Sequence, residues 1–227
     1  MIAIIRSVGE RTTQPLLQQM RARADKVALV QNVTPFSEAL RQSFLIAIES
    51  GQEYVMCIDA DVTPTIDLPR RCAAALDRAP GAYAAVPRMV DYLQGITRAV
   101  GVHAYRVSML SEALERLSEF AGTERPESKL RKAMGRSVRV ENGGVHGKGQ
   151  YYRDIYRTVL LWPAKHKKHE ERLHKYWLDN AGNHDYRVAL RAWEDGESMN
   201  VRTCDASIDT DFERVLDELG LTEKVPL

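Results

Sequence analysis

Short apolar runs alternate with amphipathic stretches along the first part of the chain. The apolar runs are residues 2–5, 26–31, 53–58 and 82–86, the last of them closed by Pro87. Residues 35–50 and 68–79 repeat their apolar positions with a helical period, and a further helix is expected from Thr13, with Pro15 in its first turn. A strand followed by a helix in units of about 25 residues predicts a mostly parallel sheet covered by helices on both faces.

The middle of the chain is less regular, and its end is mostly helical. A strand is expected at 101–106, a helix at 108–120, a turn at 124–128 and a strand at 137–141 that runs into a glycine-rich loop at 142–149. From Tyr151 onward the pattern favours helices. The fold class expected is therefore α/β, with a core at residues 1–160 and a helical extension at 161–227 packed on it as a single domain overall.

Composition narrows the class of protein. The 227 residues contain 32 Lys and Arg against 31 Asp and Glu, so the net charge of +1 argues against a general nucleic-acid binder. No apolar run is long enough to span a bilayer, and the apolar start of the chain is too short for a signal peptide. Three scattered cysteines without CxxC spacing favour a reducing compartment. We expect a cytoplasmic enzyme-sized protein.

The most specific chemical signal is an acidic pair, Asp59-Ala60-Asp61, directly after the apolar run 53–58. Ligands of open α/β sheets bind beyond the carboxyl ends of the strands. In an extended segment, two carboxylates one residue apart point to the same side, and both can reach one cation. Such hard oxygen ligands suit Mg²⁺ or Mn²⁺ with substrate phosphates completing the shell. The alternative is a solvated loop in which Asp61 caps the following helix.

The acidic pair and the segments before it resemble glycosyltransferases of the GT-A fold, close to family 2. The resemblance is carried by IDADV at 58–62, by the segment 43–61 and by IAIIRSVGERT at 2–12, and it covers roughly residues 1–160. It implies a GT-A-like fold that binds a nucleotide sugar. It also implies an Asp-x-Asp motif, Asp59-Ala60-Asp61, that holds Mn²⁺ or Mg²⁺ and the donor diphosphate. Arg41 aligns approximately with the family's phosphate-side arginine.

The loop after the first strand lies where such enzymes hold the nucleotide base and ribose. Its candidate binding residues are Arg6, Ser7, Gly9 and Glu10. Backbone amides of a glycine-containing loop, together with an arginine, could bind a phosphate or a ribose. A surface loop with solvated arginines is the alternative.

The glycine-rich segment contributes two further candidates, His146 and Lys148. Some GT-A enzymes complete the metal shell with a downstream histidine, so the resemblance implies that His146 is a third metal ligand. A stretch like residues 150–157 follows in some bacterial relatives. Lys148 is a candidate diphosphate contact. An exposed loop histidine is the alternative.

An inverting sugar transfer needs a base for the acceptor hydroxyl. In the family this carboxylate lies in a loop after the central strands, and the matching segment here, 124–127, offers Glu127, with Glu124 as the reserve. Asp91, in the separate segment 87–92, is a weaker candidate that could contact the donor sugar or the acceptor and is the next carboxylate to consider as base. Glu127 is equally explained as a favourable charge at the start of a helix.

The segment 165–175 is a basic stretch with three histidines. It is typical of a solvated basic face, which could approach an anionic lipid surface or an anionic acceptor. Helical spacing could instead gather His166, His169 and Glu170 around zinc.

Together these observations predict a metal-dependent, inverting glycosyltransferase that moves a sugar from a UDP- or GDP-sugar to an acceptor hydroxyl, here a carbohydrate or glycan. Residues 59–63 also fit the Asp-x-Asp-x-Thr pattern of haloacid-dehalogenase-like phosphatases, with Asp59 as nucleophile and Asp61 as acid. In that alternative the acidic segment 205–211 would supply a further acidic pair. A non-catalytic nucleotide-binding module is the third possibility.

Overall fold

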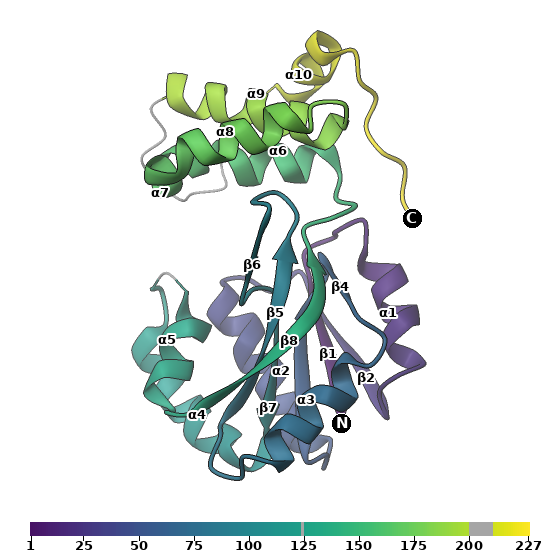
Figure 1. The fold of residues 1–227 in the computed structure, drawn as a ribbon. Helices are drawn as coiled ribbons and strands as arrows, with labels where there is room; N and C mark the ends of the chain where they lie inside the picture. The colour runs from purple at the N-terminus through teal and green to yellow at the C-terminus, as the bar shows by residue number, and fades with distance from the viewer. Residues whose placement is uncertain (124, 200–210) are drawn as a thin grey trace. The chain divides into compact units, whose positions relative to one another are not determined.

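The computed structural model describes residues 1–123, 125–199 and 211–227 (Figure 1). Contacts divide the chain into two units. The sheet unit comprises Met1–Asp91 and Ile96–Lys148, and the helical unit comprises Tyr92–Gly95 and Gly149–Leu227. The division lies after Lys148, whereas the sequence placed a boundary after residue 160, so the last helix of the predicted core, at 152–160, belongs to the helical unit.

The sheet unit is built on a mixed sheet of eight strands in the order β2-β1-β3-β7-β5-β8-β4, with β6 paired to β5. Its strands are β1 (Ile2–Ser7), β2 (Lys26–Gln31), β3 (Tyr54–Asp59), β4 (Val62–Pro64), β5 (Ala84–Asp91), β6 (Ile96–Arg98), β7 (Val102–Arg106) and β8 (Ser137–His146). Of these, β1, β2, β3, β5 and β8 run in one direction, and β4, β6 and β7 run in the other. The α/β class with a mostly parallel sheet is confirmed.

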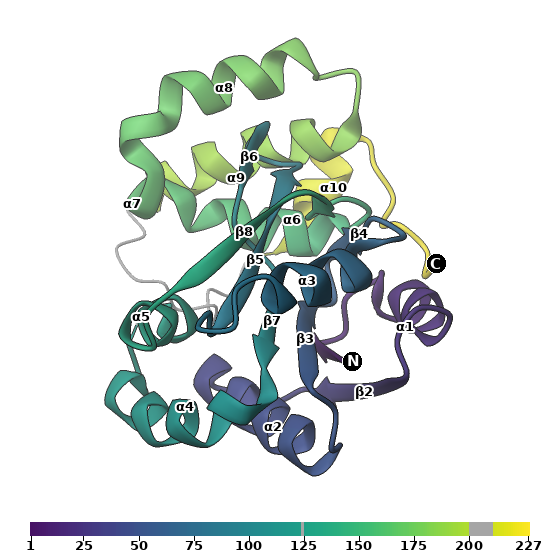
Figure 2. The same cartoon turned by 60° about the horizontal axis from the view of Figure 1, so that its bottom comes forward.

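Helices cover both faces of this sheet because side chains alternate along each strand. Ala3 and Ile5 of β1 share a core with α1 (Thr13–Arg21) and α3 (Leu68–Asp77). Ile2 and Ile4 face the opposite core, which contains α2 (Phe36–Glu49), α4 (Leu110–Leu117) and α5 (Pro126–Ala133). The helix expected at 108–120 is α4 with a short 3₁₀ turn at each end, Val107–Met109 and Ser118–Phe120. Figure 2 shows α2 beside α4 at the bottom of the view.

At two places where the sequence predicted the end of a strand, the strand continues. β5 does not end at Pro87; it continues to Asp91, with a shift in its pairing to β8 between Pro87 and Met89. A proline is tolerated at such an irregularity because no ladder hydrogen bond is lost there. The glycine-rich segment is no loop up to His146, since β8 runs through it and pairs with β4 as well as β5.

The helical unit contains six helical segments in the described residues. They are α6 (Tyr152–Leu160), α7 (Trp162–His166), a 3₁₀ turn (Lys167–His169), α8 (Glu170–Asp179), α9 (His184–Ser198) and α10 (Phe212–Leu219). Trp177 and Trp193 are fully buried in their shared core and contact each other edge to face. The indole N–H of Trp177 donates to the carbonyl of Leu93 (2.7 Å), which ties the Tyr92–Gly95 turn into this unit.

The C-terminal segment caps the start of α6. The Glu223 carboxylate accepts hydrogen bonds from the backbone N–H groups of Tyr152 (2.8 Å) and Arg153 (3.0 Å). Helix N-termini leave such donors unsatisfied, and a capping acceptor is typically worth about 0.5–2 kcal/mol. We expect Glu223→Ala to lower the free energy of unfolding by about 1 kcal/mol in urea denaturation. Exposed Glu194 of α9 offers the control, and equal losses in Glu223→Ala and Glu194→Ala would contradict the cap.

The basic stretch 165–175 is partly neutralised by its neighbours. Lys167 forms ion pairs with Glu170 and Glu197, and Lys175 pairs with Asp179 (2.8 Å). Across the described residues we find no helix with the length and apolar character needed to cross a membrane. The expected contact of this stretch with a lipid surface stays a prediction.

Two of the three cysteines fall within the described residues. Cys57 and Cys72 are free and buried, and Cys204 lies outside the described part of the chain. Burial raises the pKa of the Cys57 and Cys72 thiols to about 12, which leaves them protonated and unreactive at neutral pH.

Candidate active site

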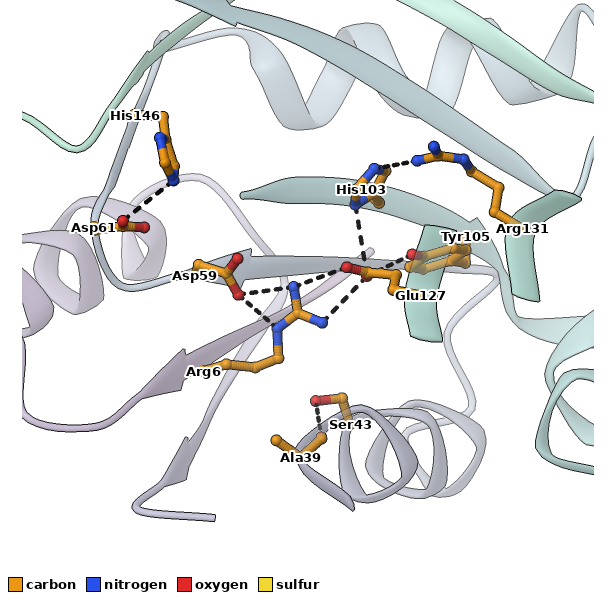
Figure 3. A network of polar contacts seen from close by, with 10 residues as sticks. All are labelled: Arg6, Ala39, Ser43, Asp59, Asp61, His103, Tyr105, Glu127, Arg131 and His146. Carbon is orange, nitrogen blue, oxygen red and sulfur yellow. Dashed lines mark hydrogen bonds and ion pairs between the residues drawn. The ribbon is translucent and has the colours of Figure 1, made fainter. Parts of the chain in front are cut away.

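The acidic pair lies at the carboxyl end of β3, but its two side chains take different partners. Asp59 is the last residue of β3, and residues 60 and 61 form a turn before β4. The expectation that an extended backbone would point both carboxylates the same way is therefore wrong. Asp59 is directed toward Arg6 and Asp61 toward His146 (Figure 3).

Arg6 is a buried cation shared by two carboxylates. The side chain is 4% exposed at the end of β1. Its Nε donates to Oδ1 of Asp59 (2.9 Å), and its Nη2 lies 2.8 Å from the same oxygen. Its Nη1 and Nη2 donate to the two oxygens of Glu127 (3.1 and 3.4 Å). Burial, with the charges of Glu127 and Asp61 nearby, raises the pKa of Asp59 to about 7 against the opposing effect of Arg6.

Glu127, the expected base, is held on several sides in the interior. The Tyr105 hydroxyl donates to Oε1 of Glu127 (2.6 Å), and Nδ1 of His103 lies 3.5 Å from the same oxygen. Burial alone would raise the pKa of Glu127, but the charges and hydrogen bonds of Arg6, His103 and Tyr105 keep it well below its usual range. Both oxygens already accept hydrogen bonds, so the role as base stays a prediction that this geometry does not favour. Its reserve, Glu124, lies outside the described residues.

His146 ends β8 between two carboxylates. Its Nε2 lies 3.2 Å from Oδ2 of Asp61, and its Nδ1 lies 3.5 Å from Oδ2 of buried Asp91, which Arg98 also pairs (2.6 Å). Burial lowers the pKa of the imidazole, but Asp61 and Asp91 outweigh it and raise the pKa of His146 to about 10. The structure thus places His146 beside Asp61, as the predicted metal shell requires. His146 lies at the end of a strand, whereas the sequence placed it in a loop.

In the loop after β1, several polar groups form hydrogen bonds with one another. The Glu10 carboxylate accepts from the Ser7 hydroxyl (2.6 Å) and from the backbone N–H of Val8 (2.8 Å), and the Gly9 N–H donates to the Ser7 hydroxyl (3.0 Å). These two amides are therefore not available to a phosphate, contrary to the expectation from the sequence. The loop instead presents the carboxylate of Glu10.

A cavity of about 240 Å³ lies at the ends of β1, β2 and β3. We call it the strand-end cavity. It is lined by Arg6, Ser7, Val8, Glu10, Val30, Val33, Phe36, Ala39, Asp59 and Asp61. Five of these residues (Arg6, Ser7, Glu10, Asp59 and Asp61) were predicted from the sequence as binding residues.

Other predicted binding residues lie away from the cavity lining. Arg41 is on α2, where it pairs with Glu38 (2.7 Å). Ala60 is buried, and its carbonyl accepts the Thr12 hydroxyl (2.6 Å). Lys148 is exposed after β8, and Gly9 shapes the loop with a φ of +98°. Their contacts with a nucleotide stay predictions.

The apolar wall of the strand-end cavity was missed from the sequence. Val30 lies in β2, Val33 lies after the end of that strand, and Phe36 and Ala39 come from the start of α2. The helical period placed Phe36 on the buried face, but the ring is 40% exposed, and the Arg6 guanidinium lies 4.7 Å from its centre. An aromatic residue in the first turn of a helix beside a strand end is the signal that could have indicated this wall.

The side chains at the rim of the cavity fit a divalent cation in part. In the described residues, no three His, Cys, Asp or Glu side chains converge as a ready metal site. Magnesium-type sites use one or two carboxylates and leave the remaining positions to substrate phosphates and water. Oδ1 of Asp61 is buried and has no hydrogen-bond partner among the described residues, and buried polar atoms of this kind usually have one. Asp61 therefore has an oxygen that a cation could take, and a metal shell of Asp59, Asp61 and His146 stays a prediction.

No protein-family model matches the chain, and no curated protein matches its sequence. Several solved structures are similar at low identity. Glucosyl-3-phosphoglycerate synthase from Mycobacterium tuberculosis, in complex with Mn²⁺, UDP-glucose and phosphoglyceric acid, is 12% identical with a TM-score of 0.42, over 63% of this chain and 70% of that one. A glycosyltransferase involved in glycosylation of the major capsid of PBCV-1 is 11% identical with a TM-score of 0.44, over 62% and 82%.

A 2-C-methyl-D-erythritol 4-phosphate cytidylyltransferase from Thermus thermophilus is similar to the same extent. It is 15% identical with a TM-score of 0.43, over 61% of this chain and 87% of that one. Because the scores and identities are this low, the function of the chain is inferred from its own residues.

Proposed function

We propose that the chain is a transferase of nucleotide-diphosphate sugars, and specifically a metal-dependent glycosyltransferase that uses a UDP- or GDP-sugar. The observation that carries this proposal is the strand-end cavity. It combines an apolar wall of Val30, Val33 and Phe36 with a carboxylate rim of Glu10 and Asp61. A nucleoside diphosphate needs an apolar slot for its base, acceptors for its ribose hydroxyls and a cation for its phosphates.

The charges of the cavity support metal dependence. Its lining contains one cation, Arg6, and three carboxylates, Glu10, Asp59 and Asp61. The charge of Arg6 is already shared between Asp59 and Glu127. A diphosphate entering alone would meet net repulsion, whereas a divalent cation bound to Asp59 and Asp61 would offset the excess negative charge of the lining and give the phosphates a positive partner.

In this proposal the residues divide the chemistry of sugar transfer. When bound, the divalent cation stabilises the negative charge that develops on the leaving diphosphate. Asp59 and Asp61 hold it, with His146 as a third ligand once its proton is displaced. Phe36 and the valines orient the base, and Glu10 accepts hydrogen bonds from the ribose. The acceptor is a carbohydrate or glycan hydroxyl.

The phosphatase alternative has less support. It requires Asp59 as the nucleophile, but Arg6 holds Oδ1 of Asp59, so only Oδ2 is left for attack. Residues 205–210, which would supply most of its second acidic cluster, lie outside the described residues.

The test is calorimetry of the wild-type chain with UDP and GDP, each with Mn²⁺ and with EDTA. We expect binding of one nucleotide that depends on Mn²⁺, followed by Mn²⁺-dependent hydrolysis of a matching nucleotide sugar in a donor panel. A chain that binds neither nucleotide with Mn²⁺ contradicts the proposal, and release of phosphate from simple phosphate esters would favour the phosphatase.

The apolar wall gives a first prediction within this proposal. Phe36→Ala is expected to weaken binding of the preferred nucleotide about tenfold, because stacking of a base on an aromatic ring is worth about 1–3 kcal/mol. Phe36→Tyr should retain binding. Ile66→Ala removes an apolar side chain that is 76% exposed and outside the cavity, so it serves as the control in the same titration. Unchanged affinity in Phe36→Ala would contradict a base on this wall.

A further inference from the structure

The buried cluster of Arg6, Asp59 and Glu127 contains one cation and two carboxylates, and only one of the carboxylates reaches the strand-end cavity. Asp59 lines the cavity, and its side chain is 32% exposed. Glu127 is outside the lining and 8% exposed. Among the described residues, the hydrogen bonds that connect Glu127 to the strand-end cavity run through Arg6.

Among the described residues, Arg6 divides its donors so that it contacts Oδ1 of Asp59 and leaves Oδ2 uncontacted. Both contacts from Arg6 go to Oδ1 of Asp59, while Nη1 and Nη2 are directed to the two oxygens of Glu127. A guanidinium facing a single carboxylate tends to bind both of its oxygens as a fork. Competition from Glu127 therefore keeps Arg6 on one oxygen of Asp59, and Oδ2 can be presented to a ligand.

Glu127 is itself held in place by residues of β7, so it can compete with Asp59 for the donors of Arg6. Tyr105 from β7 donates to Oε1 (2.6 Å), and His103, also from β7, approaches the same oxygen and contacts Arg131 of α5 through its other nitrogen. Tyr105 is held in turn by ring contacts with Phe44 and Tyr83. These contacts fix the position of the Glu127 carboxylate. A carboxylate whose role was only to neutralise the charge of Arg6 would not need such a fixed position.

We infer that Glu127 is a positioning residue that, through Arg6, holds Asp59 with one oxygen free for the cation and diphosphate in the strand-end cavity. This inference rests on the proposed function and assigns Glu127 a role other than base. It predicts that the charge of Glu127 controls the part of the affinity that comes from Mn²⁺ and the diphosphate. The affinity for the nucleoside without phosphates should not depend on Glu127.

The experiment compares Glu127→Gln with wild type in two titrations, one with the Mn²⁺ complex of the preferred nucleotide, UDP or GDP, and one with uridine or guanosine. Outer-shell partners of metal ligands typically control affinity by about 10–100-fold. We expect the Mn²⁺-nucleotide affinity to fall at least tenfold, because Arg6 then takes both oxygens of Asp59, while nucleoside affinity is unchanged. Glu119→Gln, which alters an exposed carboxylate before α5, is the matched control.

The alternatives give different results. If Glu127 is the base, Glu127→Gln binds the Mn²⁺-nucleotide complex like wild type and loses only transfer, and this result overturns the inference. A proportional loss for nucleotide and nucleoside indicates a collapsed site and also overturns it. If the wild type binds no nucleotide, the proposed function fails first.

A second variant covers the outcome in which Glu127→Gln does not fold by circular dichroism. Tyr105→Phe removes the hydroxyl that donates to Glu127 and retains the ring packing. We expect a smaller loss of Mn²⁺-nucleotide affinity, several-fold, again without loss of nucleoside affinity. Wild-type affinity for both ligands in Tyr105→Phe, with Glu127→Gln unfolded, would overturn the inference.

Discussion

Asp61→Ala is expected to lower the affinity for the Mn²⁺-nucleotide complex by on the order of a hundredfold or more. The variant removes a proposed ligand outright, and even outer-shell partners of a metal cost about 10–100-fold. It also removes the carboxylate oxygen that is buried without a partner in the described structure, Oδ1. Isothermal calorimetry with UDP and GDP in Mn²⁺ measures the loss.

The same substitution should leave the fold almost unchanged. Removing a buried, unsatisfied oxygen relieves a desolvation cost of about 1–3 kcal/mol. Against this, His146 loses its contact with Asp61 at 3.2 Å and retains only its contact with Asp91 among these carboxylates. The two effects are similar in size and opposite in sign, so we expect a change in melting temperature of only a few degrees.

Asp67→Ala is the control for this prediction. Asp67 precedes α3 and pairs with Arg71 at 3.0 Å outside the cavity, and a surface ion pair of this kind contributes little. Its Mn²⁺-nucleotide affinity should equal that of wild type. If Asp61→Ala binds the nucleotide as tightly as Asp67→Ala does, Asp61 is not a metal ligand.

The elements that the sequence predicted well are those with a strong local signal. The run at 26–31 is β2 to the residue, and the periodic stretch at 35–50 is α2 within one residue at each end. Continuous apolar runs and helical periods are local properties of the chain, and burial on both faces of a parallel strand produces the first of them. The α/β class follows from their alternation.

The elements that were missed depend on contacts between distant segments. Pro87 reads as a strand end because proline lacks a backbone donor, but β5 passes it where its pairing shifts. The glycines at 143 and 144 read as a loop, but they lie in β8 where other backbone passes close. The glycines are compatible with a loop as well as with such a close approach, and the shift at Pro87 depends on the pairing of β5 with β8, so local sequence does not decide either case.

The residues of the candidate site also differ in whether a local sequence signal reveals them. The acidic pair is visible because it directly follows an apolar run. The partner that fixes Asp59 lies 53 residues before it, and Glu127 lies 121 residues beyond that partner. Periodicity cannot relate groups so far apart, so Glu127 was recognised as important, but its connection through Arg6 was not.

Gly144→Ala is expected to produce the largest loss of stability among the variants considered. Gly144 has a φ of +127°, and a Cβ there would lie 2.2 Å from the carbonyl oxygen of Thr63 and 2.9 Å from the Cα of Pro64. Such a backbone conformation costs a residue with a side chain on the order of 1–3 kcal/mol, and overlap with backbone costs roughly as much again. We expect a loss of about 2–5 kcal/mol in the free energy of unfolding, which corresponds to about 5–15 °C in melting temperature.

Gly147→Ala separates the two parts of this effect. Gly147 also has a positive φ, +80°, but a Cβ there would meet nothing within 4 Å. Its substitution should cost only the conformational part, about 1–2 kcal/mol. Because Gly144 pairs with Pro64 and His146 pairs with Val62, separation of β8 from β4 should also displace His146 from Asp61 and weaken Mn²⁺-nucleotide binding. Equal losses of melting temperature in the two variants would mean that conformation alone explains the glycine at 144 and that β4 does not constrain it.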